Sequence, residues 1–354
     1  MQPVRPSAPW LQGVEPYDPK YLPADVMISA NENPLDVPAD VRRKIEHELR
    51  RVPFNRYPDP LANGLRDAIA QANGLDREQV LVGNGGDELL FDLALAWGGP
   101  GRTFLNMPPT FSVYGYNAML TNTTVVDVPR RADFSVDEDA VCERLARGDV
   151  DFTIVTSPNN PTGNLVSPEF AERMLNASDT LVVIDEAYFE FSRFTVRPLL
   201  ERYENLVILR TFSKAFSLAG VRVGYVLGSA KIVDELTKVR QPYSVDAVSQ
   251  TIARVVYENR AAFEPGVDAI IAERARVFAA LEELDGVEPF PSDSNYILFR
   301  IDDAAGVWQR LYDASVLVRD FSSSKYLKNC LRVSVGSREE NDRFLAALAA
   351  VMRG

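Results

Sequence analysis

The stretch DFTIVTSPNNPTGNLVSPEFAERMLNASDTLVVIDEAY, residues 151–188, decides the fold class. Each end of it is a short apolar run with the pattern of a buried strand, and PEFAERMLNAS between them has the spacing of a helix. The same alternation extends on both sides, with further strands expected at 80–83, 205–213 and 221–228. This spacing predicts right-handed crossovers and a mostly parallel sheet flanked by helices.

The pattern changes toward both ends of the chain. The first 40 residues are rich in Pro, Asn and Asp and predict an extended arm, followed by an amphipathic helix at 39–50. After about residue 230, helices such as 267–284 are interspersed with short strands at 294–301 and 331–336. We therefore expect a smaller α+β domain, and we predict an arm at 1–40 that packs with it, a large domain at 41–245 and the small domain at 246–354.

Composition excludes several classes of protein. With 46% hydrophobic and 25% charged residues among 354, the chain is not disordered, and its net charge of −12 argues against a dedicated nucleic-acid binder. No apolar run approaches the roughly 20 residues that span a bilayer, and the N-terminus has no apolar signal core. Cys142 and Cys330 lie far apart and form no CxxC, which favours a reducing, cytoplasmic location.

The single histidine narrows the chemistry. His47 falls within KIEHELRR, where it is expected on a solvated helix face. One histidine argues against a Ser-His-Asp triad and rules out a zinc site with several histidines, so no metal site is expected. Acid–base work must therefore come from Lys, Asp, Glu, Tyr or a cofactor.

Four segments carry candidate chemistry, and each also has a plain structural reading. Gly83-Asn84-Gly85-Gly86-Asp87-Glu88 follows a strand and opens a helix, which suits either a phosphate cradle or an ordinary strand–helix turn. Ser157-Pro158-Asn159-Asn160-Pro161-Thr162-Gly163 ends a buried strand, where open α/β sheets bind ligands, although these residue types also simply form turns.

The other two segments contain charges among apolar neighbours. Asp185 in VVIDEAY either caps a loop or holds a cationic partner in a dry site. Lys214 in RTFSKAF either reaches solvent or is a nucleophile whose pKa is lowered by burial and positive neighbours. Nearby Thr211, Ser213 and Arg222 offer hydroxyls and a guanidinium suited to phosphate.

Together and in this order, the segments S-P-N-N-P-T-G, D-E-A-Y and S-K-A-F…A-G-V-R-V-G-Y resemble the class I/II aminotransferases, which use pyridoxal phosphate on fold type I. Within that family the chain is most similar to the histidinol-phosphate aminotransferases, over about residues 15–345. That likeness rests on Asn31-Glu32-Asn33-Pro34, Asn55-Arg56-Tyr57-Pro58, Gly85-Gly86-Asp87-Glu88 and Leu331-Arg332-Val333-Ser334-Val335-Gly336.

The resemblance implies a role for each matching position. Lys214 would bind the cofactor aldehyde covalently and then move a proton, and Asp185 would pair with the pyridine nitrogen. The other implied cofactor contacts are Asn160 and Tyr188 at the ring oxygen, Phe111 on the ring face, Gly86, Asp87, Thr211, Ser213 and Arg222 at the phosphate, and Tyr57 at the phosphate of a neighbouring subunit in a homodimer. The implied substrate residues are Arg332, Arg319, Tyr17 and Asn31.

Two positions depart from the family pattern, and several activities stay open. Many relatives have Tyr where this chain has Phe111, and Ser or Ala is common where it has Gly86. The resemblance implies transamination of L-histidinol phosphate with 2-oxoglutarate to give imidazole acetol phosphate and glutamate, in histidine biosynthesis. The alternatives are an aromatic-amino-acid aminotransferase, a threonine-phosphate decarboxylase and, outside enzymes, a regulator with an aminotransferase-like domain. Neither a nucleic acid nor a membrane is an expected partner.

Overall fold

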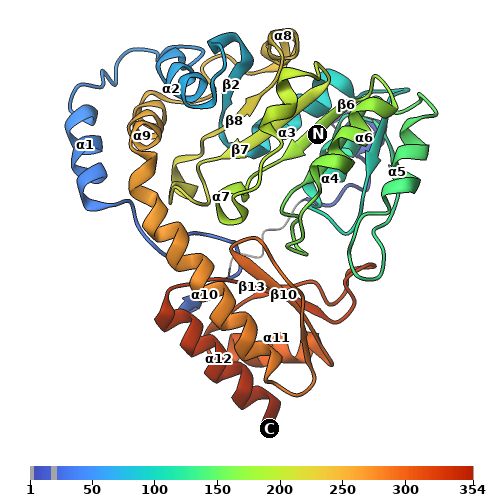
Figure 1. The fold of residues 1–354 in the computed structure, drawn as a ribbon, viewed down its shortest axis with the longest axis vertical. Helices are drawn as coiled ribbons and strands as arrows, with labels where there is room; N and C mark the ends of the chain where they lie inside the picture. The colour runs from blue at the N-terminus through green and yellow to red at the C-terminus, as the bar shows by residue number, and fades with distance from the viewer. Residues whose placement is uncertain (1–3, 17–21, 354) are drawn as a thin grey trace.

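A seven-stranded sheet forms the centre of the larger part of the molecule in the computed structural model, which describes residues 4–16 and 22–353 (Figure 1). Its strand order is β2-β8-β7-β6-β5-β3-β4, and every strand but β8 runs parallel to the others. The strands are β2 (Val80–Gly83), β3 (Thr103–Asn106), β4 (Thr124–Asp127), β5 (Phe152–Thr156), β6 (Leu181–Asp185), β7 (Leu206–Thr211) and β8 (Gly224–Leu227). The expected fold class is confirmed.

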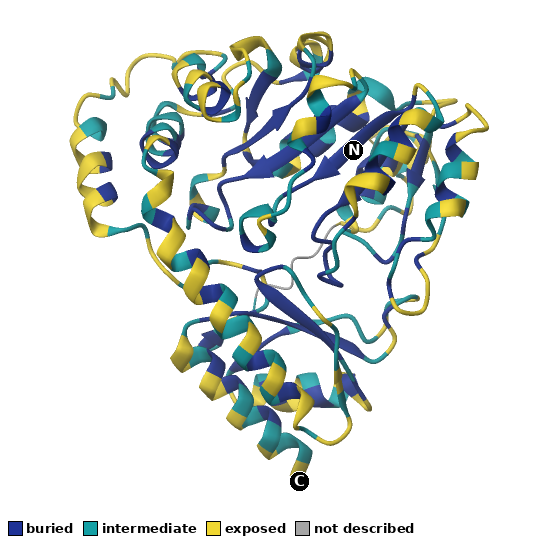
Figure 2. Cartoon of the chain, in the orientation of Figure 1, coloured by how far each residue is buried: buried dark blue, intermediate teal, exposed yellow. Residues whose placement is uncertain are grey.

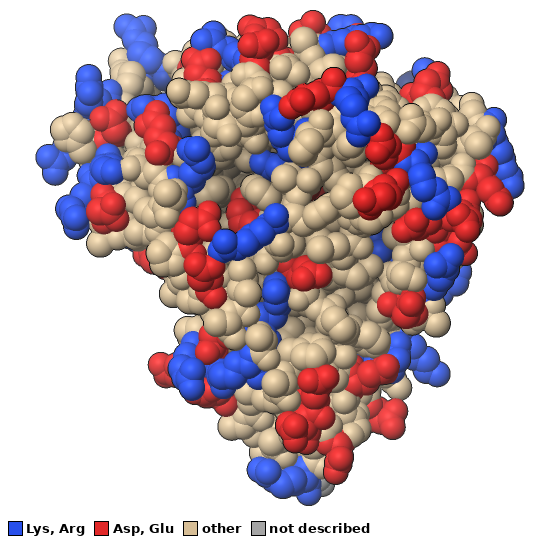
Figure 3. All heavy atoms as spheres, in the orientation of Figure 1, with Lys and Arg blue, Asp and Glu red and all other residues tan. Residues whose placement is uncertain are grey.

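Both faces of this sheet are covered by helices, as its continuous apolar strands require. Alternate residues of β6 point to opposite faces, so Val182 and Ile184 join one core while Leu181 and Val183 join the other. The first core includes α1 (Ala39–Leu49), α2 (Asn63–Asn73), α5 (Glu138–Leu145), α6 (Pro168–Ala177) and α9 (Ala247–Glu258). The second includes α3 (Gly85–Trp97), α4 (Val113–Leu120) and α8 (Ala230–Val239). Figure 2 shows the buried strands between helices with exposed outer faces, and Figure 3 shows charged side chains of both signs interspersed over the same face of the molecule.

A second sheet, of four strands, forms the centre of the smaller part, below the first in Figure 1. Its order is β12-β13-β10-β9, all antiparallel. The elements of this part are β9 (Val287–Pro289), β10 (Tyr296–Ile301), α11 (Ala304–Asp313), β11 (Val316–Leu317), β12 (Arg319–Asp320), β13 (Cys330–Ser334) and α12 (Arg338–Arg353). Ile297, Phe299 and Phe344 are fully buried in its core.

Two segments connect the parts. The long helix α10 (Glu264–Glu282) begins beside α7 (Phe189–Ser192) near the large sheet, and its last turns join the small core through Val277 and Leu281. Near the N-terminus, β1 (Val26–Met27) pairs with β11, whereas the short 3-10 helix at Pro9–Leu11 contacts α4 of the large part. No helix within residues 4–16 and 22–353 is long and apolar enough to cross a membrane.

The domain limits remain a prediction. The helix α9 lies beyond the predicted boundary at 245/246, yet it packs on α1 and α2, and its Val256 and Tyr257 belong to the core of the large sheet. We therefore propose to move that boundary into α10. The arm likewise contacts both parts, through Trp10, whose Nε1 donates to the Leu120 carbonyl, and through β1.

Candidate active site

A cavity of about 1190 Å³ lies where the carboxyl ends of the large sheet's strands face the small sheet. Open α/β sheets bind ligands at this edge because the loops that follow parallel strands converge there. Almost all the site residues expected from the sequence line the cavity, namely Asn31, Gly86, Asp87, Phe111, Asn160, Asp185, Tyr188, Thr211, Ser213, Lys214, Arg222, Arg319 and Arg332. The fold thus brings together residues that are more than 300 positions apart.

Two expected residues are not in this cavity. Tyr57 lies outside it, with 83% of its surface exposed. Tyr17 falls outside the described residues, so its role as a substrate contact stays a prediction. Within the described ranges, no three His, Cys, Asp or Glu side chains gather in a group that could hold a metal ion.

Lys214 follows β7 and projects its amine into the cavity. Its Nζ donates a hydrogen bond to the Ala30 carbonyl at 3.0 Å and lies 5.8 Å from the centre of the Tyr188 ring. Burial, and secondarily the charge of Arg332, lowers the pKa of Lys214 to about 8. About a tenth of the amine is therefore unprotonated at pH 7, far more than for an ordinary lysine, and the unprotonated form is the one that a nucleophile or a general base requires.

Asp185 is the last residue of β6 and is buried beneath the same cavity. Tyr114 donates its hydroxyl to Oδ2 at 2.6 Å, and the Ala187 amide donates to Oδ1 at 3.0 Å. Burial raises the pKa of Asp185 to about 6, although both hydrogen bonds act to lower it. A cation bound next to this carboxylate would favour its ionised form, so the position suits a protonated ring nitrogen.

The N-terminus of α3 and the residues after β7 form an anion cradle. Gly85 has φ +80°, a backbone conformation that favours glycine, and a Cβ there would lie 2.7 Å from Nη2 of Arg222, so the arginine would have to move aside. Arg222 donates to Asp87 at 3.0 Å and to the Ser213 hydroxyl at 3.4 Å, and Thr211 donates to that hydroxyl at 3.0 Å. Helix amides, hydroxyls and a guanidinium at one point are the donors that a phosphate group needs.

Gly86, where the resemblance leads to the expectation of Ser or Ala, has no steric reason to be glycine. A Cβ at this position would meet nothing closer than Cδ2 of Leu209, at the ordinary contact distance of 3.4 Å. Ser or Ala would therefore fit here. Phe111, the other departure, lines the cavity and packs its ring edge-on against Tyr114 at 5.5 Å between centres.

The opposite wall carries two arginines on neighbouring strands. Arg319 of β12 and Arg332 of β13 are direct register partners, and both line the cavity. Arg332 donates to Oδ1 of Asn160 and to the Ser29 carbonyl, the latter at 2.7 Å. Two guanidinium groups on one wall favour a substrate that carries an anionic group.

Asn31 and Tyr188 are joined beside these arginines. Asn31 Nδ2 donates to the Tyr188 hydroxyl at 3.0 Å, and Ser334 Oγ donates to Oδ1 of Asn31 at 3.1 Å. Asn31 is buried and adopts φ +56°, a conformation that Asn tolerates better than most residues. The Asn31 side chain therefore fixes the position of the phenol that faces the cavity.

The sequence reasoning missed Tyr114 and Thr156. Their hydroxyl oxygens lie 2.6 Å apart, directly beside Asp185. The signal available was weak: Tyr114 comes three residues after Phe111, a spacing that places two side chains on one face at the start of a helix. Nothing in the local sequence indicated that this face meets β6.

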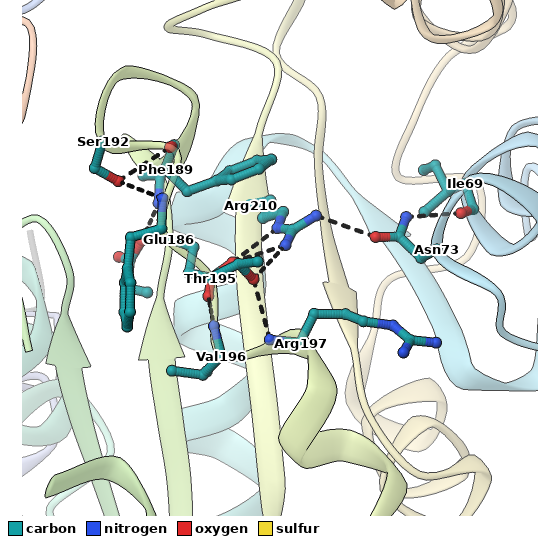
Figure 4. Close-up of polar contacts among 12 residues, drawn as sticks. Ile69, Asn73, Glu186, Phe189, Ser192, Thr195, Val196, Arg197 and Arg210 are labelled. Carbon is teal, nitrogen blue, oxygen red and sulfur yellow. Dashed lines mark hydrogen bonds and ion pairs between the residues drawn. The ribbon is translucent and has the colours of Figure 1, made fainter. Parts of the chain in front are cut away.

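A second buried network holds the strand ends from behind (Figure 4). Arg210 donates through Nε to Glu186 at 2.9 Å, through Nη2 to the Thr195 hydroxyl at 2.8 Å and through Nη1 to Asn73 at 3.1 Å. Its guanidinium lies 3.8 Å from the centre of the Phe189 ring. Glu186 immediately follows Asp185, and Arg210 immediately precedes Thr211. The network therefore fixes the ends of β6 and β7 that carry site residues.

Comparison with known proteins gave one family and many relatives. The family model described as aminotransferase class I and II matches residues 25–348. A histidinol-phosphate aminotransferase of Chlorobaculum tepidum is 40% identical over 326 residues, covering 92% of this chain and 94% of that protein.

Solved structures give the same fold. A histidinol-phosphate aminotransferase of Sinorhizobium meliloti in complex with pyridoxal-5′-phosphate has a TM-score of 0.87 at 24% identity, covering 98% of this chain and 97% of that one. An L-threonine-O-3-phosphate decarboxylase of Porphyromonas gingivalis has a TM-score of 0.81 at 25% identity, covering 93% and 100%. The fold is therefore shared by proteins with different reactions.

Proposed function

The chain belongs to the class I and II aminotransferases, and from that membership we propose that it is a pyridoxal-phosphate-dependent histidinol-phosphate aminotransferase. It would transfer the amino group of L-histidinol phosphate to 2-oxoglutarate, giving imidazole acetol phosphate and glutamate in histidine biosynthesis. The observation that carries the proposal is the shared cavity, which combines Lys214, Asp185, the anion cradle and the Arg319–Arg332 wall. The relatives that match over more than nine tenths of the chain support the same substrate.

The donor set fits the cofactor. The phosphate of the cofactor would be held by the N-terminus of α3 together with Thr211, Ser213 and Arg222. Lys214 would bind the aldehyde of the cofactor, and Asp185 would pair with its ring nitrogen. Asn160 and Tyr188 would bind the ring oxygen, and Phe111 would cover the ring face. When bound, the cofactor supplies an electron sink for the carbanion at the substrate carbon.

The residues of the chain divide the remaining work. Lys214 Nζ, with a pKa near 8, can accept a proton from the substrate carbon and later return one, because it exists in both forms near neutral pH. Asp185 would place a negative charge beside the ring nitrogen, and the Tyr114 hydroxyl fixes the orientation of its carboxylate. Arg332 and Arg319 orient the anionic end of the donor and the carboxylates of the acceptor.

We also propose a homodimer with composite sites. Tyr57 and Phe54 expose 83% and 81% of their surfaces on one segment, outside the cavity. Large exposed aromatic residues close together are typical of an interaction surface, and a twofold dimer would bring each Tyr57 to the other subunit's anion cradle.

The two cysteines are free thiols, which supports a cytoplasmic location.

Steady-state kinetics on three amino donors test the substrate. We expect kcat/KM for L-histidinol phosphate, with 2-oxoglutarate as acceptor, to exceed that for phenylalanine by at least about 10²-fold, because phenylalanine lacks the phosphate that the arginines would bind. Threonine phosphate should release no carbon dioxide. A preference for phenylalanine, or carbon dioxide release from threonine phosphate, would identify one of the alternative activities instead.

Complementation tests the composite site. Tyr57→Ala and Lys214→Ala homodimers should each be severely impaired, and mixed dimers should regain activity in the site that combines an intact Tyr57 with an intact Lys214. If both homodimers are impaired, subunits exchange and no activity returns, Tyr57 does not act across the interface.

A further inference from the structure

The surface outside the cavity contains an aromatic pair that the reaction itself does not explain. Tyr57 stacks on Tyr243 with ring centres 4.6 Å apart and an interplanar angle of 21°. Tyr57 lies in the turn between α1 and α2, and Tyr243 lies in the loop between α8 and α9, so residues 186 positions apart meet here. Tyr243 itself is 41% exposed. Among the residues that the structure describes, Tyr243 is the aromatic ring that contacts Tyr57.

Tyr243 is held in an unfavourable backbone conformation. Its φ is +58°, in the left-handed region where a bulky aromatic residue is an outlier. Such strain persists only where the surrounding structure determines it, and it concentrates at functional positions. A glycine or asparagine would adopt this φ at lower cost, so the tyrosine at this position points to a use for its ring.

The loop around Tyr243 is tied to both the Tyr57 turn and the anion cradle. Gln250 Nε2 donates to the carbonyls of Asp59 and Val245, at 2.9 and 2.8 Å, and so joins the two loops. On the other side, Asn84 Nδ2 donates to the Ser244 carbonyl at 3.0 Å. Asn84 directly precedes the glycines that open α3, so the segment supporting Tyr57 is anchored to this chain's own cradle.

From this arrangement we propose that Tyr243 is a positioning residue that holds the Tyr57 ring in place for the neighbouring subunit's cofactor site. The proposal rests on the composite dimer proposed above. A phenol on an exposed turn samples many orientations, and a stacked partner on an anchored loop removes most of them before the cofactor binds. Tyr243 would thus act on the partner's site and not on the cavity of its own chain.

Three replacements separate the ring from the backbone strain. Tyr243→Phe keeps the stacking ring, and we expect the dissociation constant for pyridoxal 5′-phosphate to stay within about twofold. Tyr243→Ala and Tyr243→Gly remove the ring and should raise that constant about 3- to 10-fold, the range that corresponds to losing one aromatic pair. Because glycine tolerates positive φ, Tyr243→Gly should be no less stable than Tyr243→Ala. If Tyr243 had only a structural role, the loss of cofactor affinity in each variant would instead be proportional to its loss of folding stability.

Hybrid dimers give the decisive measurement. In the first hybrid, one subunit carries Lys214→Ala and the other Tyr243→Ala. In the second, one subunit carries both changes and the other none. Each hybrid keeps one intact Lys214, and cofactor binding there is measured as borohydride-trapped pyridoxal phosphate on that lysine over a range of cofactor concentrations. We expect unchanged affinity in the first hybrid and a 3- to 10-fold loss in the second, since only there does the intact Lys214 face an unsupported Tyr57.

A parallel pair of hybrids with Tyr57→Phe in place of Tyr243→Ala separates two kinds of failure. If Tyr57→Phe shows no difference between the two arrangements, the composite site is wrong. If Tyr57→Phe shows the difference and Tyr243→Ala weakens both hybrids equally or neither, the positioning role of Tyr243 is overturned and the composite site stands.

Discussion

Replacing Tyr114 with phenylalanine should shift the pH at which the protein loses affinity for pyridoxal 5′-phosphate. The Tyr114 hydroxyl donates to Asp185 at 2.6 Å, and this hydrogen bond opposes the burial that raises the pKa of Asp185 to about 6. A hydrogen bond to a charged group contributes roughly 1.5–3 kcal/mol, and 1.36 kcal/mol corresponds to one pKa unit. The variant should therefore have an Asp185 pKa about 1–2 units higher.

The direction of the effect follows from the charge that the cofactor needs. The pKa of Asp185 is raised to about 6, so its carboxylate becomes protonated as the pH falls through about 6. The protonated form cannot pair with a protonated ring nitrogen, so cofactor affinity is lost over the same pH range. For a pKa of about 6 moving to about 7–8, the variant should bind nearly as well as the parent at pH 8.5, about two- to tenfold more weakly at pH 7, and about 8- to 80-fold more weakly at pH 5.5.

The measurement is a fluorescence titration of the cofactor-free protein with pyridoxal 5′-phosphate at pH values from 5.5 to 8.5. The ratio of the two dissociation constants cancels the ionisations that both proteins share. Thr156→Val is the matched control, because it removes the hydroxyl next to Tyr114 and leaves the Asp185 donor in place. A ratio that does not change with pH, or an equal shift in the control, would refute the reasoning.

Four further outcomes follow from the site and its supports. Borohydride should fix the bound cofactor onto the Lys214 peptide, as mass spectrometry would show, and attachment to another lysine would contradict the assignment. Asp185→Asn should keep the fold, by circular dichroism, but lose at least about 10²-fold in kcat, as for one preorganised electrostatic partner; near-normal turnover would make Asp185 structural only. Arg332→Lys should raise KM for both histidinol phosphate and 2-oxoglutarate, because lysine cannot form paired parallel hydrogen bonds; an effect on one alone would mean that separate residues bind the two anions. Arg210→Met should lower the free energy of unfolding in urea by about 3–5 kcal/mol, since Glu186 stays buried without its cation; a loss below about 1 kcal/mol would show that the pair contributes little.

Much of the large sheet could be predicted because most of its strands are short, continuous apolar runs that can be recognised in the sequence. The strand expected at 80–83 is observed at those residues, and β6 lies inside the apolar run at 180–188. Such strands are buried on both faces, so their composition alone identifies them. The site residues were predictable chiefly because their motifs resemble a known family; from the residues alone, only ligand binding at loops that follow strands could be expected.

The strands expected at 294–301 and 331–336 overlap β10 and β13, but the two-residue strands could not be predicted in the same way. The strand β12 has two residues, and β1 has two that pair with β11 about 290 positions later. Segments of this length have no periodicity, and only the tertiary pairing makes them strands. The position of Tyr114 beside Asp185 is a similar case, because it depends on how α4 crosses the sheet and not on any local motif.

The segment from Ser29 to Asn33 has a practical consequence for anyone shortening this protein. Its backbone accepts hydrogen bonds from Arg332 of the small sheet and from Lys214 of the large one, and Asn33 donates back to the carbonyls of Lys214 and Ala215, both at 3.1 Å. By composition these residues belong to the proline-rich N-terminal arm, which a protein engineer would remove first. A version that begins after residue 33 would lose part of the cavity wall and one of the two connections between the large and small parts, so trimming must stop before β1.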